Sequence, residues 1–176
     1  MALDTTSFGF QTSGGGADTN TQKFMIPLSF DMTMESNNDW SAWARTGGFN
    51  DALNSEDLAT SLGNYRMPKN VPIIFAEPVI FKGFTCQVGI ENTEITNVNL
   101  QMVKTDVFGT SYNAAALGST VSVATSATNT GYELTKMDYD ENFAVDEGLT
   151  FYFYPTGTLS TDRQIYVTIT LAFTYQ

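Results

Sequence analysis

The chain has 176 residues and a formal net charge of −11, with eight Lys and Arg against nineteen Asp and Glu and no histidine. Such an acidic chain repels nucleic-acid phosphates and anionic membranes, so neither is an expected partner. Without histidine there is no Ser-His or Cys-His catalytic pair and little zinc chemistry, and the single cysteine, Cys86, cannot form an internal disulfide.

Composition favours strands and turns over surface helices. Hydrophobic residues make up 42% of the chain and charged residues only 15%, so much of its polarity comes from Thr, Asn, Ser and Gly. The length suits one domain. No apolar run approaches the ~20 residues of a membrane span, and the first residues lack a signal-peptide pattern. We therefore expect a protein that is made in a cytosol and stays soluble until it assembles.

Residues 1–22 are predicted to form an N-terminal arm. They are rich in Thr, Ser, Gln and Asn, show no sustained periodicity and contain Gly14-Gly15-Gly16. One interpretation is a disordered terminus. The other is a docking arm that carries three large apolar side chains on a glycine hinge; these are Leu3, Phe8 and Phe10.

The predicted domain, residues 23–176, begins with a strand over Phe24–Met34, whose even positions are large and apolar. Pro27 lies on the other face, which indicates an edge strand or a strand start. Residues 35–70 then form a long loop, with a short helix predicted over Ser55–Leu62. A loop of this length either packs on something or carries a function.

Strand-like runs recur through the rest of the chain. They are Val71–Phe75, Val79–Ile90, Ile95–Val103, Thr120–Ala124, Tyr132–Met137, Leu149–Tyr154 and Gln164–Tyr175. The last run alternates apolar and hydroxyl-bearing residues so regularly that we place it deep within a sheet. The pattern predicts an all-β fold, an antiparallel β-sandwich or jelly roll of about eight strands.

Few side chains indicate chemistry. Asp138 and Asp140 superficially resemble the start of a calcium loop, but Phe143 and Leu149 occupy the glycine and glutamate positions, so an EF-hand is excluded. A looser Ca²⁺ site and an exposed acidic turn both stay open as alternatives. Glycoside hydrolysis by these acids has no supporting feature. Cys86 shares the parity of apolar neighbours, which predicts a core position.

Aromatic residues in the long loop are the candidates for contacts. Trp40, Trp43, Phe49 and Tyr65 suit a subunit interface or sugar stacking, because aromatic side chains supply large contact area with little entropy loss. The alternative is a small satellite core beneath the loop.

The ending of the chain resembles that of small jelly-roll virion proteins of tailed bacteriophages, of the decoration, fibre and tail-tip types. The resemblance covers roughly residues 79–176 and rests on G-L-T-F-Y-F-Y-P-T-G-T-L followed by R-Q-I-Y-V-T-I-T-L-A-F. It implies an assembly protein, commonly a trimer, with an arm anchored to the capsid or tail and a β domain that projects outward.

The first hypothesis is therefore a non-enzymatic structural protein of a phage virion, made in the host cytoplasm, that forms a homotrimer and binds other virion proteins. No cofactor or catalytic residue is expected. The expected interface residues are Leu3, Phe8, Phe10, Trp40, Trp43 and Phe49. The alternative is a receptor- or carbohydrate-binding module in which a surface glycan stacks on loop aromatics, with Ca²⁺ held by Asp138 and Asp140. An enzyme has the least support.

Overall fold

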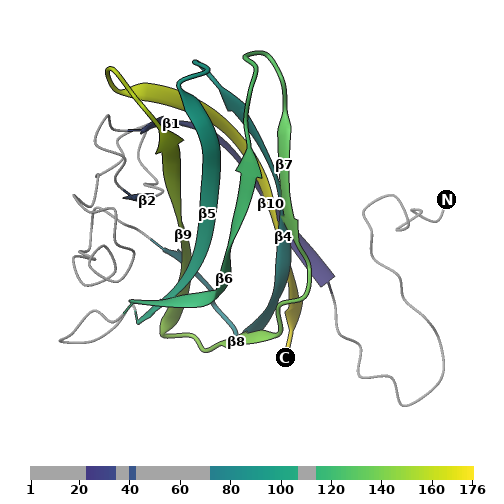
Figure 1. Ribbon diagram of the computed structural model, residues 1–176. Helices are drawn as coiled ribbons and strands as arrows, with labels where there is room; N and C mark the ends of the chain where they lie inside the picture. Colours follow the sequence, from purple (N-terminus) through teal and green to yellow (C-terminus); the bar gives the residue numbers. More distant parts are fainter. Residues whose placement is uncertain (1–22, 35–39, 43–71, 107–113) are drawn as a thin grey trace, which may run out of the picture.

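The described part of the chain is built from ten β-strands in two sheets (Figure 1). The computed structural model describes residues 23–34, 40–42, 72–106 and 114–176. The strands are β1 (Lys23–Met34), β2 (Ser41–Ala42), β3 (Ile73–Ile74), β4 (Val79–Ile90), β5 (Ile95–Asp106), β6 (Ala114–Ala124), β7 (Tyr132–Lys136), β8 (Glu141–Phe143), β9 (Glu147–Gly157) and β10 (Arg163–Tyr175). Within these residues no helix long and apolar enough for a membrane span is found.

The strand order is that of a jelly roll. Sheet A runs β1-β10-β4-β7, with β8 beside β7 along β4, and sheet B runs β2-β9-β5-β6, with β3 also on β9. Every pairing is antiparallel. The first long strand thus pairs with the last, and β2 pairs with the last but one, as in a long hairpin rolled into two layers. The predicted fold class is confirmed.

Strand β10 lies inside sheet A, between β1 and β4. Its alternation predicts one buried face, and the structure confirms it: the inward residues are 3% exposed or less, and they are Ile165, Val167, Ile169, Leu171 and Phe173. Among the described strands β1 pairs only with β10, so the edge position expected from Pro27 is also confirmed there.

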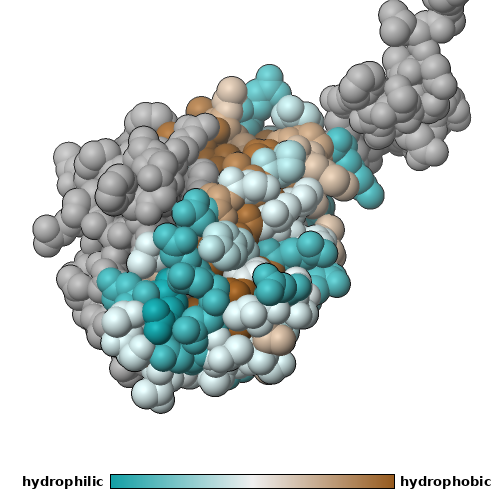
Figure 2. Space-filling view, turned by 90° about the horizontal axis from the view of Figure 1, so that it is seen from above, coloured by the Kyte–Doolittle hydropathy of each residue, from teal (hydrophilic) through white to brown (hydrophobic). Residues whose placement is uncertain are grey.

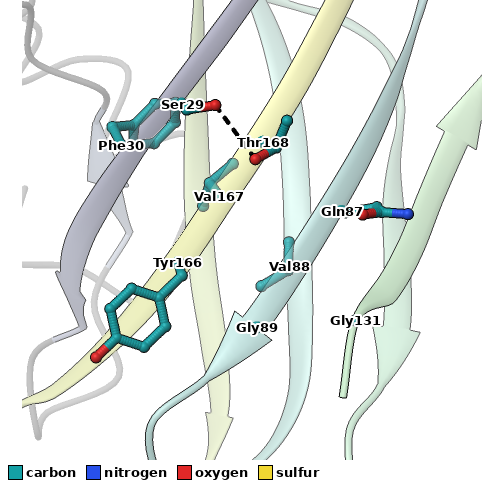
Figure 3. Close-up of a pocket in the computed structure, with 9 residues that line it drawn as sticks. All are labelled: Ser29, Phe30, Gln87, Val88, Gly89, Gly131, Tyr166, Val167 and Thr168. Carbon is teal, nitrogen blue, oxygen red and sulfur yellow. Dashed lines mark hydrogen bonds between the residues drawn. The ribbon is translucent and has the colours of Figure 1, made fainter. Parts of the chain in front are cut away.

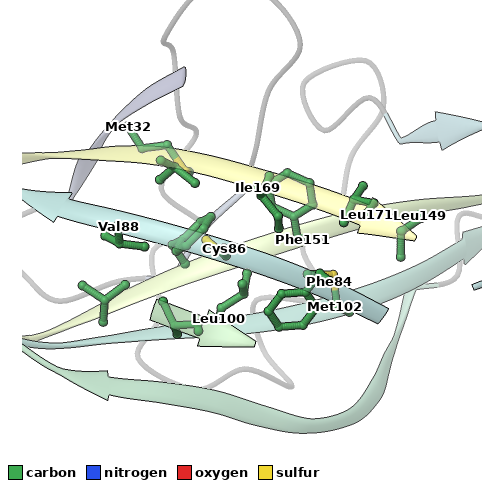
Figure 4. Close-up of a cluster of buried hydrophobic side chains, with 14 of the residues drawn as sticks. Met32, Phe84, Cys86, Val88, Leu100, Met102, Leu149, Phe151, Ile169 and Leu171 are labelled. Atoms are coloured by element: carbon green, nitrogen blue, oxygen red, sulfur yellow. The ribbon is translucent and has the colours of Figure 1, made fainter. Parts of the chain in front are cut away.

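The core lies between the two sheets and takes side chains from both (Figure 4). Phe173 is central to its aromatic part. Its ring centroid lies 4.9 Å from that of Phe75, 5.3 Å from that of Phe81 and 5.2 Å from that of Phe24. Residues of β1, of β4 and of the segment after β3 therefore meet at one residue of β10.

Gly83 marks a bulge in β4. The register with β10 shifts between Ala172 and Phe173, and Gly83 adopts φ +144°. The partner strand is interrupted at the same level, because β7 ends at Lys136 and β8 begins at Glu141. Gly89 shows no such shift and pairs regularly with Tyr166.

β6 is longer than the predicted Thr120–Ala124, and its pairing with β5 contains a second bulge. The strand starts at Ala114, in an alanine run typical of helices, and its register with β5 shifts around Gln101. The Gln101 side chain is 1% exposed, and its Nε2 donates hydrogen bonds to the carbonyls of Leu117 (2.9 Å) and Met102 (2.8 Å). A buried amide thus satisfies backbone carbonyls that the irregular ladder leaves over.

The predicted end of the strand before Pro155 is wrong. β9 continues to Gly157, and Pro155 pairs with Val98 of β5. Proline is accommodated because, among the described strands, β2 and β3 pair with β9 only up to Phe153. The predicted helix over Ser55–Leu62, the arm 1–22 and most of the loop 35–70 lie outside the described residues.

Candidate functional site

The two sheets differ in the exposure of their outer faces. On sheet B a group of outward residues in the central strands β5 and β9 is nearly inaccessible in the single chain; they are Gln101, Val103, Thr105, Thr150 and Tyr152. On sheet A, by contrast, Met25 is 66% exposed and Tyr166 is 52% exposed. Sheet A therefore presents an open face. In sheet B, by contrast, β9 carries large side chains on both of its faces, and Phe151, Tyr152 and Phe153 are all buried within the single chain.

Hydroxyl and amide side chains form rows across the open face of sheet A. Two neighbouring rows are Ser29, Thr168, Gln87, Glu133 and then Pro27, Thr170, Thr85, Thr135. The central strands contain no charged residue from Tyr166 to Thr174 in β10 or from Gly83 to Gly89 in β4. In a chain of net charge −11, the middle of this face is thus electrically neutral.

A third row lies at the end of the face where β1 begins. Met25 pairs with Ala172, and Ala172 pairs with Gly83. A Cβ on Gly83 would lie 2.6 Å from Cα of Met137, so Met137 is the next residue across the sheet after Gly83. Met25 and Met137 are 66% and 53% exposed. Two methionines therefore flank a low stretch made of alanine and glycine, and we call these four residues the methionine row.

A shallow groove of about 360 Å³ occupies the other end of the face (Figure 3). Its polar side chains are Ser29, Gln87 and Thr168, and Tyr166 extends beside them. The hydroxyls of Ser29 and Thr168 are hydrogen-bonded at 3.3 Å. The groove combines one exposed aromatic ring with uncharged donors and acceptors.

Trp40 is not an exposed contact residue in the single chain. It is 5% exposed, and its ring stacks on Tyr154 with centroids 5.1 Å apart. The pairing of β2 with β9 at Phe153 and Tyr152 brings it there. Its position favours the alternative of a small aromatic cluster beneath the loop. The other predicted contact residues lie outside the described residues and stay predictions; they are Leu3, Phe8, Phe10, Trp43 and Phe49, as well as the loop aromatic Tyr65.

The acidic turn does not form a recognisable calcium site. Asp138 and Asp140 flank Tyr139, which is buried with its ring centroid 5.0 Å from that of Phe81. Asp140 forms an ion pair with Lys82. Across the described ranges, no three acidic or cysteine side chains gather in a way that could hold a metal ion. The geometry favours the exposed-turn alternative.

Cys86 occupies the predicted core position and is 0% exposed. Burial raises the pKa of its thiol to about 12, so the thiol is protonated at neutral pH. A protonated and inaccessible thiol is a poor nucleophile.

Glu94 ties together two turns at one end of the sandwich. Its carboxylate accepts hydrogen bonds from the Ser160 backbone N–H (3.2 Å), the Ser160 hydroxyl (2.9 Å) and Nε of Arg163 (2.9 Å). The turn after β4 is thereby joined to the turn before β10. Several interactions hold the pKa of Glu94 below its ordinary value. The hydrogen bonds from Ser160 contribute most, and the hydrogen bond and positive charge of Arg163 add to them.

This arrangement predicts an acid-sensitive part of the stability. Because the pKa of Glu94 is lower in the folded chain, its contribution is present above about pH 4.3, the reference value for glutamate, and is lost as pH falls through the folded value. We expect Glu94→Gln to be less stable than the wild type at pH 7 and to lose less on acidification. Urea denaturation between pH 7 and about pH 3 measures this; parallel pH profiles for the two proteins would contradict it.

Comparisons with known proteins find distant structural likenesses only. No family model matches the chain. No curated protein matches it either. Among solved structures, it is similar to a bacterial lipoprotein from Bacteroides thetaiotaomicron, with TM-score 0.40, 11% identity and 95% of both chains covered. It is also similar to a chain of infectious bursal disease virus Gx strain (TM-score 0.33, 12% identity, 94% of this chain and 37% of that chain). A third is from Desmodium yellow mottle tymovirus (TM-score 0.25, 10% identity, 94% and 95% covered).

These likenesses leave the fold assignment to the strand order of the chain itself.

The face of the molecule seen in Figure 2 is unevenly polar. Hydrophobic residues gather in the upper part of the view and hydrophilic ones in the lower part.

Proposed function

We propose that the chain is a non-enzymatic structural protein of a tailed-bacteriophage virion that assembles with copies of itself through the open face of sheet A. The observation that carries the proposal is the neutral centre of this face in a chain of net charge −11. Subunit interfaces are depleted in charge at their centre and enriched in methionine. Acidic copies repel one another elsewhere, so this face is where they approach at least cost.

The methionine row is the proposed centre of contact. Met25 and Met137 stand on either side of Ala172 and Gly83, so a methionine of one copy fits the low stretch of another. Four residues bury at most a few hundred Å², whereas a specific interface takes roughly 800 Å² per partner. The arm 1–22, with its three large apolar residues, is expected to supply part of the remainder and to anchor the protein to other virion proteins.

Two charges on the methionine row are expected to separate the subunits. Wild-type protein should have a mass three times that of the 19.3-kDa chain in light scattering, as the predicted homotrimer requires. A double variant, Met25→Glu with Met137→Glu, should be monomeric, because it places acidic groups on either side of the neutral stretch formed by Ala172 and Gly83. Val145→Glu is the matched control, since Val145 is 47% exposed but lies in the turn between β8 and β9.

Each outcome bears on a different part of the proposal. A wild-type monomer at every concentration contradicts self-assembly, and a double variant that keeps the wild-type mass contradicts this face. The virion role is tested by mass spectrometry of purified phage particles produced by the cell that makes the protein. Complete particles without peptides of this chain would contradict that role.

A further inference from the structure

The groove beside Tyr166 owes its shape to two missing side chains. A Cβ on Gly89 would lie 3.8 Å from Cβ and Cδ2 of Tyr166, and a Cβ on Gly131 would lie 4.0 Å from Oε1 of Gln87. Neither glycine has a positive φ, so neither is required by its backbone conformation. Gly89 instead leaves room beside the tyrosine ring, and Gly131 leaves room on the far side of the glutamine amide, toward β7 (Figure 3).

The chemistry of the groove selects for a neutral polar ligand. Gln87 has both donors and acceptors in its amide, and Ser29 and Thr168 have hydroxyl groups that can do both. No charged residue lines the groove. Two carboxylates stand at the edges of the groove, Asp31 opposite Tyr166 and Glu133 opposite Gln87, and together with the net charge of −11 they disfavour an anion.

The exposed ring of Tyr166 adds an apolar surface to these polar groups. The side chain is 52% exposed although it lies in the middle strand of a sheet, next to the small residue Gly89. A flat aromatic face beside hydroxyl and amide groups matches a ligand that has C–H groups on one side and hydroxyls around its rim. A pyranose ring has this distribution.

We propose that this groove binds a neutral saccharide, with a sugar ring on Tyr166 and its hydroxyl groups on Gln87 and the Ser29–Thr168 pair. This site goes beyond the structural role and differs from the loop aromatics that the sequence indicated. Ser29 lies four positions along β1 from Met25, about 13 Å. The groove and the methionine row are therefore separate parts of the same face.

An array of neutral hexose and N-acetylhexosamine oligosaccharides, with sialylated glycans for comparison, tests the proposal on the full chain. We expect binding to neutral glycans, confirmed for the best one by calorimetry. Tyr166→Ala should weaken that binding at least about tenfold, the equivalent of ~1.4 kcal/mol, and Gln87→Ala should also weaken it. Tyr175→Ala is the control, because Tyr175 is 38% exposed at the opposite end of β10.

The results distinguish this site from the assembly proposal. The Tyr166→Ala protein should keep the mass of the wild type in light scattering and its melting temperature within a few degrees. A blank array, a preference for sialylated glycans, or equal affinity of the wild type and Tyr166→Ala would overturn the saccharide site. The same binding measurement on the Met25→Glu, Met137→Glu double variant, in which the face is expected to be uncovered, separates a groove covered by assembly from a groove that does not bind a saccharide.

Discussion

Replacing Gly83 with alanine is expected to destabilise the fold by about 3–5 kcal/mol. The residue has φ +144°, and a Cβ there would lie 2.2 Å from the carbonyl oxygen of Lys136. Backbone atoms cannot move away as a flexible side chain would, so either β4 or the end of β7 must shift. The free energy of unfolding in urea, at fixed protein concentration, measures the loss.

Gly89 provides the matched control in the same strand. A Cβ at this position meets only ordinary contacts at 3.8 Å, and the φ angle is not positive. Gly89→Ala should leave stability unchanged or raise it by up to about 1 kcal/mol, because glycine loses more conformational freedom on folding than alanine does. Equal effects of the two substitutions would show that the bulge at Gly83 is not as described.

Phe173→Ala should cost about 3–5 kcal/mol, the range measured for buried phenylalanine. Phe173 is 1% exposed and contacts the rings of Phe24, Phe75 and Phe81. Its removal therefore leaves a cavity bordered by these three aromatic rings. Thermal or urea unfolding, again at constant concentration, gives the value.

Tyr175→Ala is the natural comparison, two residues further along β10. Tyr175 is 38% exposed and touches Phe24, with ring centroids 4.9 Å apart. We expect a loss below about 1.5 kcal/mol, the upper end of what an aromatic pair contributes beyond area burial. A loss at Phe173 no larger than that at Tyr175 would place the centre of the aromatic core elsewhere.

The layered fold could be predicted because one face of each long strand is apolar. β10 shows this most clearly, since Ile165, Val167, Ile169, Leu171 and Phe173 point inward while Thr168 and Thr170 point outward. The sequence was misleading where a local preference opposed the sheet. The alanine run at the start of β6 is typical of helices. Pro155 is typical of a strand end, yet β9 continues through it and pairs there with β5 among the described strands.

The open face of sheet A could not be found from the sequence. Its rows join residues from β1, β10, β4 and β7, and such neighbours follow from register, which hydrophobic pattern alone does not give across non-consecutive strands. The sequence left Trp40 either at an interface or in a satellite core, and the β2–β9 pairing, which places it on Tyr154, could not be read from the sequence. The proximity of Gly89 to Tyr166 likewise follows from the register of β4 and β10.

Oxidation of methionines tests the proposed assembly face most directly. Met25 and Met137 are exposed in the single chain, whereas Met32 and Met34, at 3% and 0% exposure, serve as slow internal standards. Hydrogen peroxide converts exposed methionine to the sulfoxide, and mass spectrometry gives the rate at each position.

The account predicts that the oxidation of Met25 and Met137 slows as the protein concentration rises into the range where light scattering reports a trimer. Their rates should then approach those of Met32 and Met34. If both exposed methionines are oxidised at the same high rate in the dilute and in the assembled protein, copies of this chain do not meet at this face.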